Sequence, residues 1–227
     1  MKFPEETAKE EQGGHLAEYI LGGQDGLVNV MSLVLGVASA TNDTRLVIIS
    51  GLVGLAAETI SMGAVAYTST RAAQDFYHSE VAREEEHIKT REVQERRFLQ
   101  HVYEKKGFRG RLLHQIIAKI TGNKRVWLKE IVNEEIGPAE RVEHPMRSAL
   151  TVGVATLVGS IIPLIPFFFL SVRTSIVVSL IAGMIILFGV GYWKSKLTVG
   201  VAWKNGLEMA LIGTFAALVG YGIGKLL

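Results

Sequence analysis

The sequence predicts an all-α, polytopic membrane protein with five transmembrane helices and a cytoplasmic three-helix domain inserted between the second and the third. The first observation is a set of apolar stretches, each near the ~20 residues that a helix needs to cross a bilayer. They cover approximately residues 20–41, 46–69, 147–171, 174–193 and 205–224. The second is charge: 16 of the 24 Lys and Arg, and 13 of the 22 Asp and Glu, lie between Arg71 and Arg147. One chain is therefore expected to face two solvents.

The predicted domains follow one another along the chain. They are a cytoplasmic N-terminal segment (1–19), transmembrane helices 1 and 2 (20–71), a cytoplasmic metal-binding helical domain (72–145) and transmembrane helices 3 to 5 (146–227). A cytoplasmic N-terminus places all but three of the Lys and Arg on that side, the exceptions being Arg45, Arg173 and Lys225. The positive-inside rule favours this orientation. Because the acidic start lacks the features of a cleavable signal peptide, we expect the first span to direct insertion.

The central domain is predicted to contain three helices. The first, 72–106, continues the second span without Gly or Pro and ends at Gly107. The second, 108–121, repeats apolar residues with the spacing of one buried stripe, at Leu112, Leu113, Ile116, Ile117 and Ile120. The third, 124–136, ends at Gly137-Pro138 and offers three side chains to a core, Trp127, Ile131 and Val132.

Asp25 is the most unusual residue of the predicted spans. It lies in the run ILGGQDGLVNVMSLVLGVASA, with Asn29 one helical turn later. A carboxylate at membrane depth costs several kcal/mol unless it faces a bundle interior or water, so Asp25 indicates an ion or proton pathway. Asn29 is equally explained by an interhelical hydrogen bond.

Glu58 interrupts the second span, and Met62 lies four residues later. On one face of a helix, a carboxylate oxygen and a thioether sulfur can bracket an ion. Two alternatives stay open: Glu58 can pair with a basic side chain, and Met62 can simply fill space in the bundle.

Potential metal ligands gather on the predicted helix 72–106. At 100° per residue, Glu80, Glu84, His87 and Glu95 share one face, with Glu92 to one side. The third helix offers further carboxylates, Glu130, Glu134 and Glu135. Carboxylates with an imidazole suit Mn²⁺, Fe²⁺ and related ions. Basic residues interleave with these glutamates, and on pattern alone a solvated, salt-bridged helix explains them better.

Other features bear on packing and on partners. The GxxxG pair Gly220 and Gly224 indicates close helix packing or dimerisation. Pro163 and Pro166 should bend the third span and free backbone carbonyls that need a partner. The lack of cysteine excludes disulfides and thiolate metal sites. A net charge of +2 argues against a polyanionic partner such as nucleic acid.

Four motifs together resemble the vacuolar iron transporter family. They are the segment ILGGQDGLV (20–28), the later LVLGV (33–37), Ser61-Met62 followed by Tyr67, and PLIP (163–166). The similarity extends from about residue 15 to residue 227. It implies a five-span protomer, a homodimer with its pathway between protomers, and a cytoplasmic three-helix domain that binds metal. It also implies proton-coupled export of Fe²⁺, often with Mn²⁺, from the cytoplasm.

The resemblance assigns roles to individual residues. Asp25 matches the family's first-span aspartate and Met62 its second-span methionine, both of which contact the moving ion. The family has two Glu-x-x-Glu pairs eleven residues apart in the cytoplasmic domain. Glu92 and Glu95 fit the second pair and Glu84 the later member of the first, where Val81 leaves Glu80 or Glu85 as the partner. Glu135 matches a glutamate of the third helix. Ala66 stands where many relatives have a glutamate, a role that Glu58 could take.

We therefore predict a proton-coupled exporter of Fe²⁺ that also accepts Mn²⁺, with Co²⁺ and Zn²⁺ as further candidate ions. It is expected to be a homodimer in contact with membrane lipid, to have no permanently bound cofactor and not to be an enzyme. The predicted location is a prokaryotic inner membrane, or a vacuolar membrane in a eukaryote. The alternatives are a membrane-tethered di-iron ferroxidase or a metal sensor. A ferroxidase is disfavoured because only one Glu-x-x-His sequence, Glu84 to His87, is present.

Overall fold

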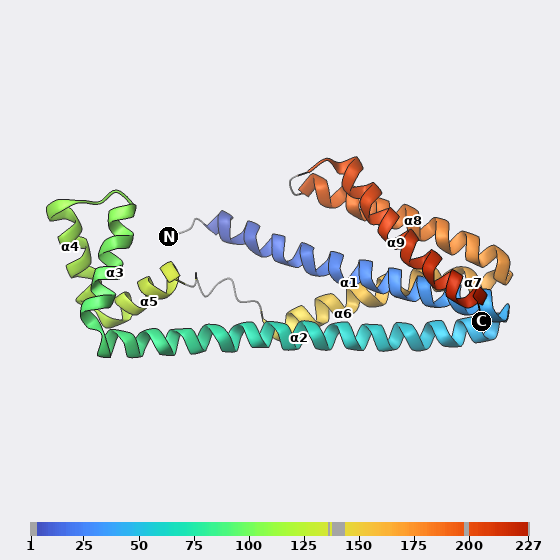
Figure 1. The fold of residues 1–227 in the computed structure, drawn as a ribbon, viewed down its shortest axis with the longest axis horizontal. Coiled ribbons are helices and arrows are strands. Elements are labelled where there is room, and N and C mark those ends of the chain that lie inside the picture. The colour runs from blue at the N-terminus through green and yellow to red at the C-terminus, as the bar shows by residue number, and fades with distance from the viewer. Residues whose placement is uncertain (1–3, 136, 138–143, 198–199, 227) are drawn as a thin grey trace. The chain divides into compact units, whose positions relative to one another are not determined.

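The structure, a computed structural model, describes residues 4–135, 137, 144–197 and 200–226, with side chains from Gly14 onward. Every regular element in these residues is a helix (Figure 1). Five helical segments are long and apolar enough to cross a membrane: Gly14–Thr41, Thr44–Thr90, Pro145–Phe169, Val172–Leu197 and Ala202–Leu226. The predicted all-α class and number of spans are confirmed. The chain forms two compact units, residues 1–67 with 145–227, and residues 68–144.

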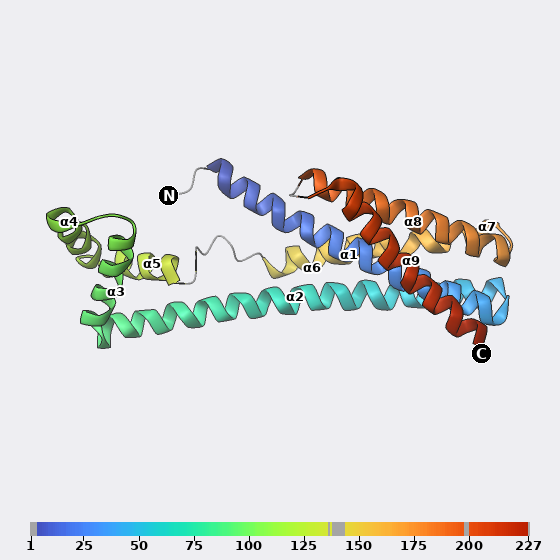
Figure 2. The same cartoon turned by 45° about the horizontal axis from the view of Figure 1, so that its top comes forward.

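Helix α1 (Pro4–Thr41) is the central helix of the first unit. It packs against α6 (Pro145–Ile161), α8 (Val172–Leu197) and α9 (Ala202–Leu226), as Figures 1 and 2 show. The helix begins well before residue 20, where the first span was predicted to start. It supplies five core side chains that are each at most 1% exposed: Leu27, Val30, Met31, Val34 and Leu35.

Glycines allow α1 to approach its neighbours closely. A Cβ on Gly26 would overlap the carbonyl oxygen of Thr156 in α6. Near the other end of α1, a Cβ on Gly220 or Gly224 of α9 would overlap the α1 backbone. The GxxxG pair therefore serves packing within one chain.

The third span is interrupted, as Pro163 and Pro166 predicted. Helix α6 ends at Ile161, a 3₁₀ turn η2 covers Ile162–Leu164, and α7 covers Ile165–Phe169. The hydroxyls of two serines in α8 donate to the proline carbonyls: Ser179 Oγ to Pro163 O at 2.7 Å, and Ser175 Oγ to Pro166 O at 3.0 Å. Both proline carbonyls thus have a protein donor, and Pro166 O also accepts from the Leu170 backbone N–H at 2.9 Å.

Replacing Ser179 with Ala should lower the stability of the first unit. The substitution leaves the buried Pro163 carbonyl without its donor, which costs about 1 kcal/mol. The thermal unfolding midpoint of the detergent-solubilised protein would report the loss. Ser79→Ala is the matched control, because the Ser79 hydroxyl is exposed and bonds only to its own helix. Equal midpoints in the two variants would contradict the role given to Ser179.

The second unit contains the last part of α2 (Thr44–Thr90) and three further helices: α3 (Glu92–Lys105), α4 (Gly110–Thr121) and α5 (Lys124–Glu135). Its core is formed by Ile88, Leu99, Leu113, Ile117, Trp127 and Ile131. The predicted burial of Trp127, Ile131 and Val132 is confirmed. Leu112, predicted to lie in the buried stripe, is 54% exposed. Ile136 and Pro138, at the predicted end of α5, lie outside the described residues.

The predicted continuous helix 72–106 is wrong at one point. Helix α2 does continue far beyond the apolar stretch, but it ends at Thr90, and α3 begins after Arg91. Arg91 leaves the helical conformation, with φ −131° and ψ 38°. No Gly or Pro marks this break in the sequence. Gly107, by contrast, follows the end of α3 with a φ of 95°, close to its predicted role.

Candidate metal sites

Asp25 and Glu58 form a carboxyl pair between α1 and α2 in the first unit. The Asp25 side chain lies within hydrogen-bonding distance of Glu58 and of Asn29. Asn29 Nδ2 also donates to Glu58 Oε1 at 3.0 Å. A hydrogen bond between two carboxyl groups requires a proton on one of them, because an ionised carboxylate only accepts. The pair can therefore hold either a shared proton or a cation.

The contacts of Glu58 answer two questions that the sequence left open. Its partners are an amide and a carboxyl, and it forms no ion pair with a basic side chain within the described residues. Asn29 makes an interhelical hydrogen bond, and that bond joins it to Glu58 of the candidate ion site. Met62 is partly buried one turn beyond Glu58 on α2. The structure thus brings Asp25, Asn29 and Glu58 into contact, with Met62 next along the helix.

A groove leads away from this pair along α1. It has a volume of about 470 Å³ and lies between α1 and α9. Asn29, which bonds to Glu58, lines it together with Ser32, Leu33, Gly36, Val37, Ala40, Gly220, Ile223 and Gly224. Because its α1 residues run from Asn29 to Ala40, the groove follows the second half of the helix. It extends from Asn29, which bonds to Glu58, toward the C-terminal end of α1.

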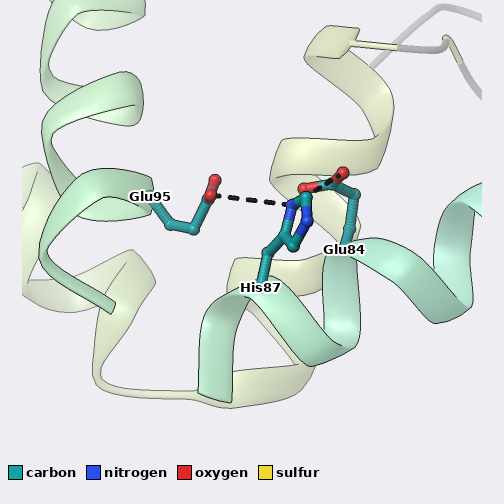
Figure 3. Close-up of side chains that lie close together, drawn as sticks. All are labelled: Glu84, His87 and Glu95. Atoms are coloured by element: carbon teal, nitrogen blue, oxygen red, sulfur yellow. Dashed lines mark ion pairs between the residues drawn. The ribbon is translucent and has the colours of Figure 1, made fainter. Parts of the chain in front are cut away.

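A second group of ligand-type side chains lies in the second unit. Glu84 and His87 come from α2 and Glu95 from α3, and Figure 3 shows the three side chains pointing toward one another. One ligand atom from each lies within 4.8 Å of the others. His87 Nδ1 is 3.4 Å from Glu84 Oε1 and 3.9 Å from Glu95 Oε1. The side chain of Glu84 is 2% exposed, so a carboxylate is buried here beside an imidazole.

The charges of this group act on one another. Burial, followed by the charge of Glu84, raises the pKa of Glu95. Partial burial of its carboxyl group and the charges of Glu84 and Glu95 raise the pKa of Glu135 at the end of α5. Carboxyl groups that resist ionisation because of like charges would each be relieved by a bound cation. Glu135, predicted as a ligand, is thus electrostatically coupled to the three.

Three other predicted ligands have different partners. Glu80 forms an ion pair with Arg83, Glu85 with Lys89 at 3.0 Å, and Glu92 with Arg96 at 3.5 Å. The side chain of Glu92 is 62% exposed. The structure therefore does not bring Glu80, Glu85 or Glu92 into the group. Of the glutamates in the two Glu-x-x-Glu pairs, Glu84 and Glu95, which are eleven residues apart, lie close together in this group.

The chain was compared with known proteins. The model of the VIT family matches residues 16–225. The chain belongs to the VIT family. It is 30% identical to "Vacuolar iron transporter 2" of Oryza sativa subsp. japonica, over 97% of this chain and 91% of that protein. It is also 30% identical to "Protein CCC1" of Saccharomyces cerevisiae, over 93% of this chain and 69% of that protein. These relatives agree with the prediction of a multi-pass metal transporter that is not an enzyme.

Sequence reasoning missed Glu18 of this VIT-family chain. Glu18 lies seven residues before Asp25, so the two share a face of α1 two turns apart. Ser148 Oγ donates to Glu18 Oε1, while Glu18 Oε2 is buried without a hydrogen bond and has His15 Nδ1 at 3.6 Å. The residue was overlooked because the span was predicted to start at residue 20. The spacing of seven was the signal that could have found it.

Metal should stabilise the second unit of this VIT-family chain more at pH 7 than at pH 5. Because the pKa values of Glu95 and Glu135 are raised in the folded state, protonation of these carboxyl groups favours folding. Their contribution to the free energy of unfolding is complete below the unfolded-state pKa of about 4.3, and it is lost as the pH rises through their folded-state pKa. A cation offsets the repulsion. Mn²⁺ at 100 times its Kd should add about 2.7 kcal/mol at pH 7. Glu95→Gln should raise the metal-free unfolding midpoint at pH 7 and reduce the effect of Mn²⁺.

Trp127 fluorescence provides the measurement, with Trp193 and Trp203 replaced by Phe so that only the core of the second unit is followed. Glu86→Gln is the matched control, since the Glu86 side chain is 64% exposed and pairs only with Lys89. A Mn²⁺ effect of the same size at both pH values would contradict the expectation.

Proposed function

We propose that this protein is a proton-coupled transporter that exports Fe²⁺ from the cytoplasm and accepts Mn²⁺ as a second substrate. The observation that carries the proposal is the carboxyl pair Asp25 and Glu58, which lies within two candidate membrane spans. Membrane segments rarely contain carboxyl groups, and a pair in mutual contact marks an ion or proton route. Relatives named as vacuolar iron transporters support iron as the substrate.

Competition between a proton and a metal ion for the same oxygens provides the coupling. With a proton between Asp25 and Glu58, the pair is stable without metal. Loss of that proton creates a site with two carboxylates, to which the sulfur of Met62 can add a softer ligand. Metal binding therefore releases protons, and protonation from the other side releases metal. The hydrogen bond from Asn29 Nδ2 holds the Glu58 carboxyl beside Asp25.

The route on either side of the pair follows from the same helix. Glu18 lies two turns toward the N-terminus, and its buried Oε2, which accepts no hydrogen bond and has His15 Nδ1 at 3.6 Å, could accept a cation or a proton. On the other side, the groove from Asn29 to Ala40 leads toward the C-terminal end of α1. We infer that the ion passes along this face of α1 under alternating access.

The second unit collects the ion in the cytoplasm. Glu84, His87 and Glu95 supply the ligands, with Glu135 beside them. The positive-inside rule supports this orientation, because most Lys and Arg then face the cytoplasm. The host membrane is proposed to be a prokaryotic inner membrane, with a vacuolar membrane as the alternative in a eukaryote.

A homodimer with the pathway between protomers is supported by the exposure of α2. Only 11% of the most apolar part of this span is buried, against 28–56% for the other four. Ala57, Ser61 and Ala64 are exposed on it with the spacing of one helical stripe. Small residues at this spacing permit close approach of two membrane helices. A second copy of the chain would cover this stripe next to Glu58 and Met62.

Flux measurements in proteoliposomes test the proposal. Vesicles with an acidic interior should accumulate Fe²⁺ faster than vesicles without a pH difference, and a protonophore should remove the advantage. Competition by Mn²⁺, Co²⁺ and Zn²⁺ in the same assay ranks the substrates. Fe²⁺ uptake that ignores the gradient would contradict proton coupling. Vesicles that take up none of the four ions would contradict the transport function itself.

A further inference from the structure

We propose that His87 sets the ion preference of the site in the second unit, because its nitrogen favours Fe²⁺, Co²⁺ and Zn²⁺ over Mg²⁺. The inference rests on the proposed function, in which Glu84, His87 and Glu95 bind metal. It identifies His87 as the residue that determines specificity at that site.

Carboxylates alone make a poor filter for transition metals. Oxygen ligands suit Mg²⁺, Ca²⁺ and Mn²⁺, whereas imidazole suits Zn²⁺, Fe²⁺ and the ions between them in the affinity series. A capture site made only of Glu84, Glu95 and Glu135 would thus be open to hard cations. One nitrogen ligand changes the order of affinities, because Mg²⁺ gains little from imidazole.

The imidazole is placed as a ligand would be. Two ligands about 2.1 Å from one ion, at angles of 90–110°, lie about 3.0–3.4 Å apart. His87 Nδ1 is 3.4 Å from Glu84 Oε1 and 3.9 Å from Glu95 Oε1. Both distances exceed the 2.7–3.2 Å of a good N–H···O hydrogen bond. The imidazole and the two carboxylates therefore converge without forming good hydrogen bonds to one another. Their ligand atoms lie within 4.8 Å of one another, and a bound ion would draw them closer. Arg83 Nε also lies 3.6 Å from Glu84 Oε1, a contact that the ion would have to displace.

The ring nitrogen is available, and the site is open on its side. The Nδ1 of His87 faces the two carboxylates, while the Nδ1 of His114 lies 2.8 Å from the Gly110 carbonyl of its own helix. The His87 side chain is 28% exposed and that of Glu84 only 2%. An ion would therefore arrive past the imidazole and be held against the buried carboxylate.

The helix break after Thr90 creates this mixed set of ligands. Glu84 and His87 are three residues apart on α2, and Arg91 N–H donates to the His87 carbonyl at 2.7 Å. If α2 and α3 were one straight helix, His87 and Glu95 would be separated by about 12 Å along its axis. The turn at Arg91 brings the Glu95 carboxyl close to the His87 imidazole. The site thus depends on the break.

The experiment compares ion affinities in the purified full-length protein. His87→Glu replaces the imidazole with another carboxylate, and His101→Glu is the matched control, because His101 is an exposed histidine of α3. Co²⁺ binding is measured by titration, and Mg²⁺ is then added as a competitor. The component of binding that Glu95→Gln removes belongs to this site, which separates it from Asp25. The ratio of the Mg²⁺ Kd to the Co²⁺ Kd should fall at least tenfold in His87→Glu and stay unchanged in His101→Glu.

A direct readout accompanies the affinities. Pulsed EPR of bound Mn²⁺ should show coupling to a histidine ¹⁴N in the wild type and none in His87→Glu. If His87→Glu does not fold, His87→Gln removes the nitrogen ligand without adding charge, and the same loss of coupling and fall in ratio is expected. Suppose that Glu95→Gln removes the bound ion, but His87→Glu leaves the ratio of the Mg²⁺ Kd to the Co²⁺ Kd unchanged and the wild type shows no ¹⁴N coupling. This result would overturn the role of His87 and leave the capture site in place. The absence of any component sensitive to Glu95→Gln would overturn the capture site itself.

Discussion

Asp25→Ala is expected to reduce Fe²⁺ movement across proteoliposome membranes, under an imposed proton gradient, to the level of protein-free vesicles. Asp25 contributes one half of the carboxyl pair with Glu58. Without it, the proposed site would lose both a metal ligand and the partner with which Glu58 would share a proton. Asp25→Asn separates charge from shape, because the amide keeps a hydrogen bond to Glu58 but binds a cation poorly. We expect it to be inactive as well.

The matched control for this experiment is Asp75→Ala. Asp75 is an aspartate of the same chain, but its side chain is 60% exposed and forms a surface ion pair with Arg71, which contributes little to stability. This variant should transport Fe²⁺ at the wild-type rate. Undiminished transport by Asp25→Ala, in vesicles where the control also transports, would remove Asp25 from the pathway.

Gly26→Val is expected to cause a large loss of stability in the first unit. A Cβ at this position would overlap the Thr156 carbonyl and lie 2.5 Å from Ser160 Oγ, both in α6. Backbone atoms of a packed helix cannot move aside as a flexible side chain can, so α1 and α6 would have to separate. We expect a cost of about 3 kcal/mol. This corresponds to a decrease of about 6–12 °C in the unfolding midpoint for a chain of this size.

Gly189→Ala is the matched control in this case. Gly189 also lies inside a membrane helix, α8, but an added Cβ meets no atom within 4 Å. Since Ala favours a helix over Gly by up to about 1 kcal/mol, this variant should be as stable as the wild type or more so. Thermal unfolding in detergent measures both proteins. A wild-type midpoint for Gly26→Val would show that the close α1–α6 crossing is not required.

Local sequence properties were sufficient for the membrane helices. Hydropathy depends on composition over about 20 residues, and four of the five predicted spans lie within an apolar helical segment of the structure. The other, 147–171, extends two residues past the end of its segment at Phe169. The interruption at Pro163 and Pro166 was also predictable, because proline lacks a backbone donor wherever it occurs. The hydrogen bonds from Ser175 and Ser179 to the two proline carbonyls were not predictable, since the packing of α8 brings these serines to them.

The helix break at Arg91 shows where local information ends. Charged residues such as those around Arg91 differ by only a few tenths of a kcal/mol in helix propensity, so the sequence predicted an uninterrupted helix. The turn to α3 is accompanied by burial of Ile88 and Leu99 in one core. Glu95 was expected on the same face of a straight helix as Glu84 and His87, but it comes close to them only because the helix turns.

By itself, the sequence determined the class of the protein, the number of its spans and the likeness of its motifs to a transporter family, because hydropathy, charge and motifs are properties of short segments. It also singled out Asp25, since a carboxylate in an apolar run is an anomaly in any fold. Only the tertiary structure decided which side chains meet: Glu58 and Asn29 with Asp25, and His87 with Glu84 and Glu95. These contacts depend on how helices cross and where one of them turns, and such geometry arises from packing between residues far apart in the chain.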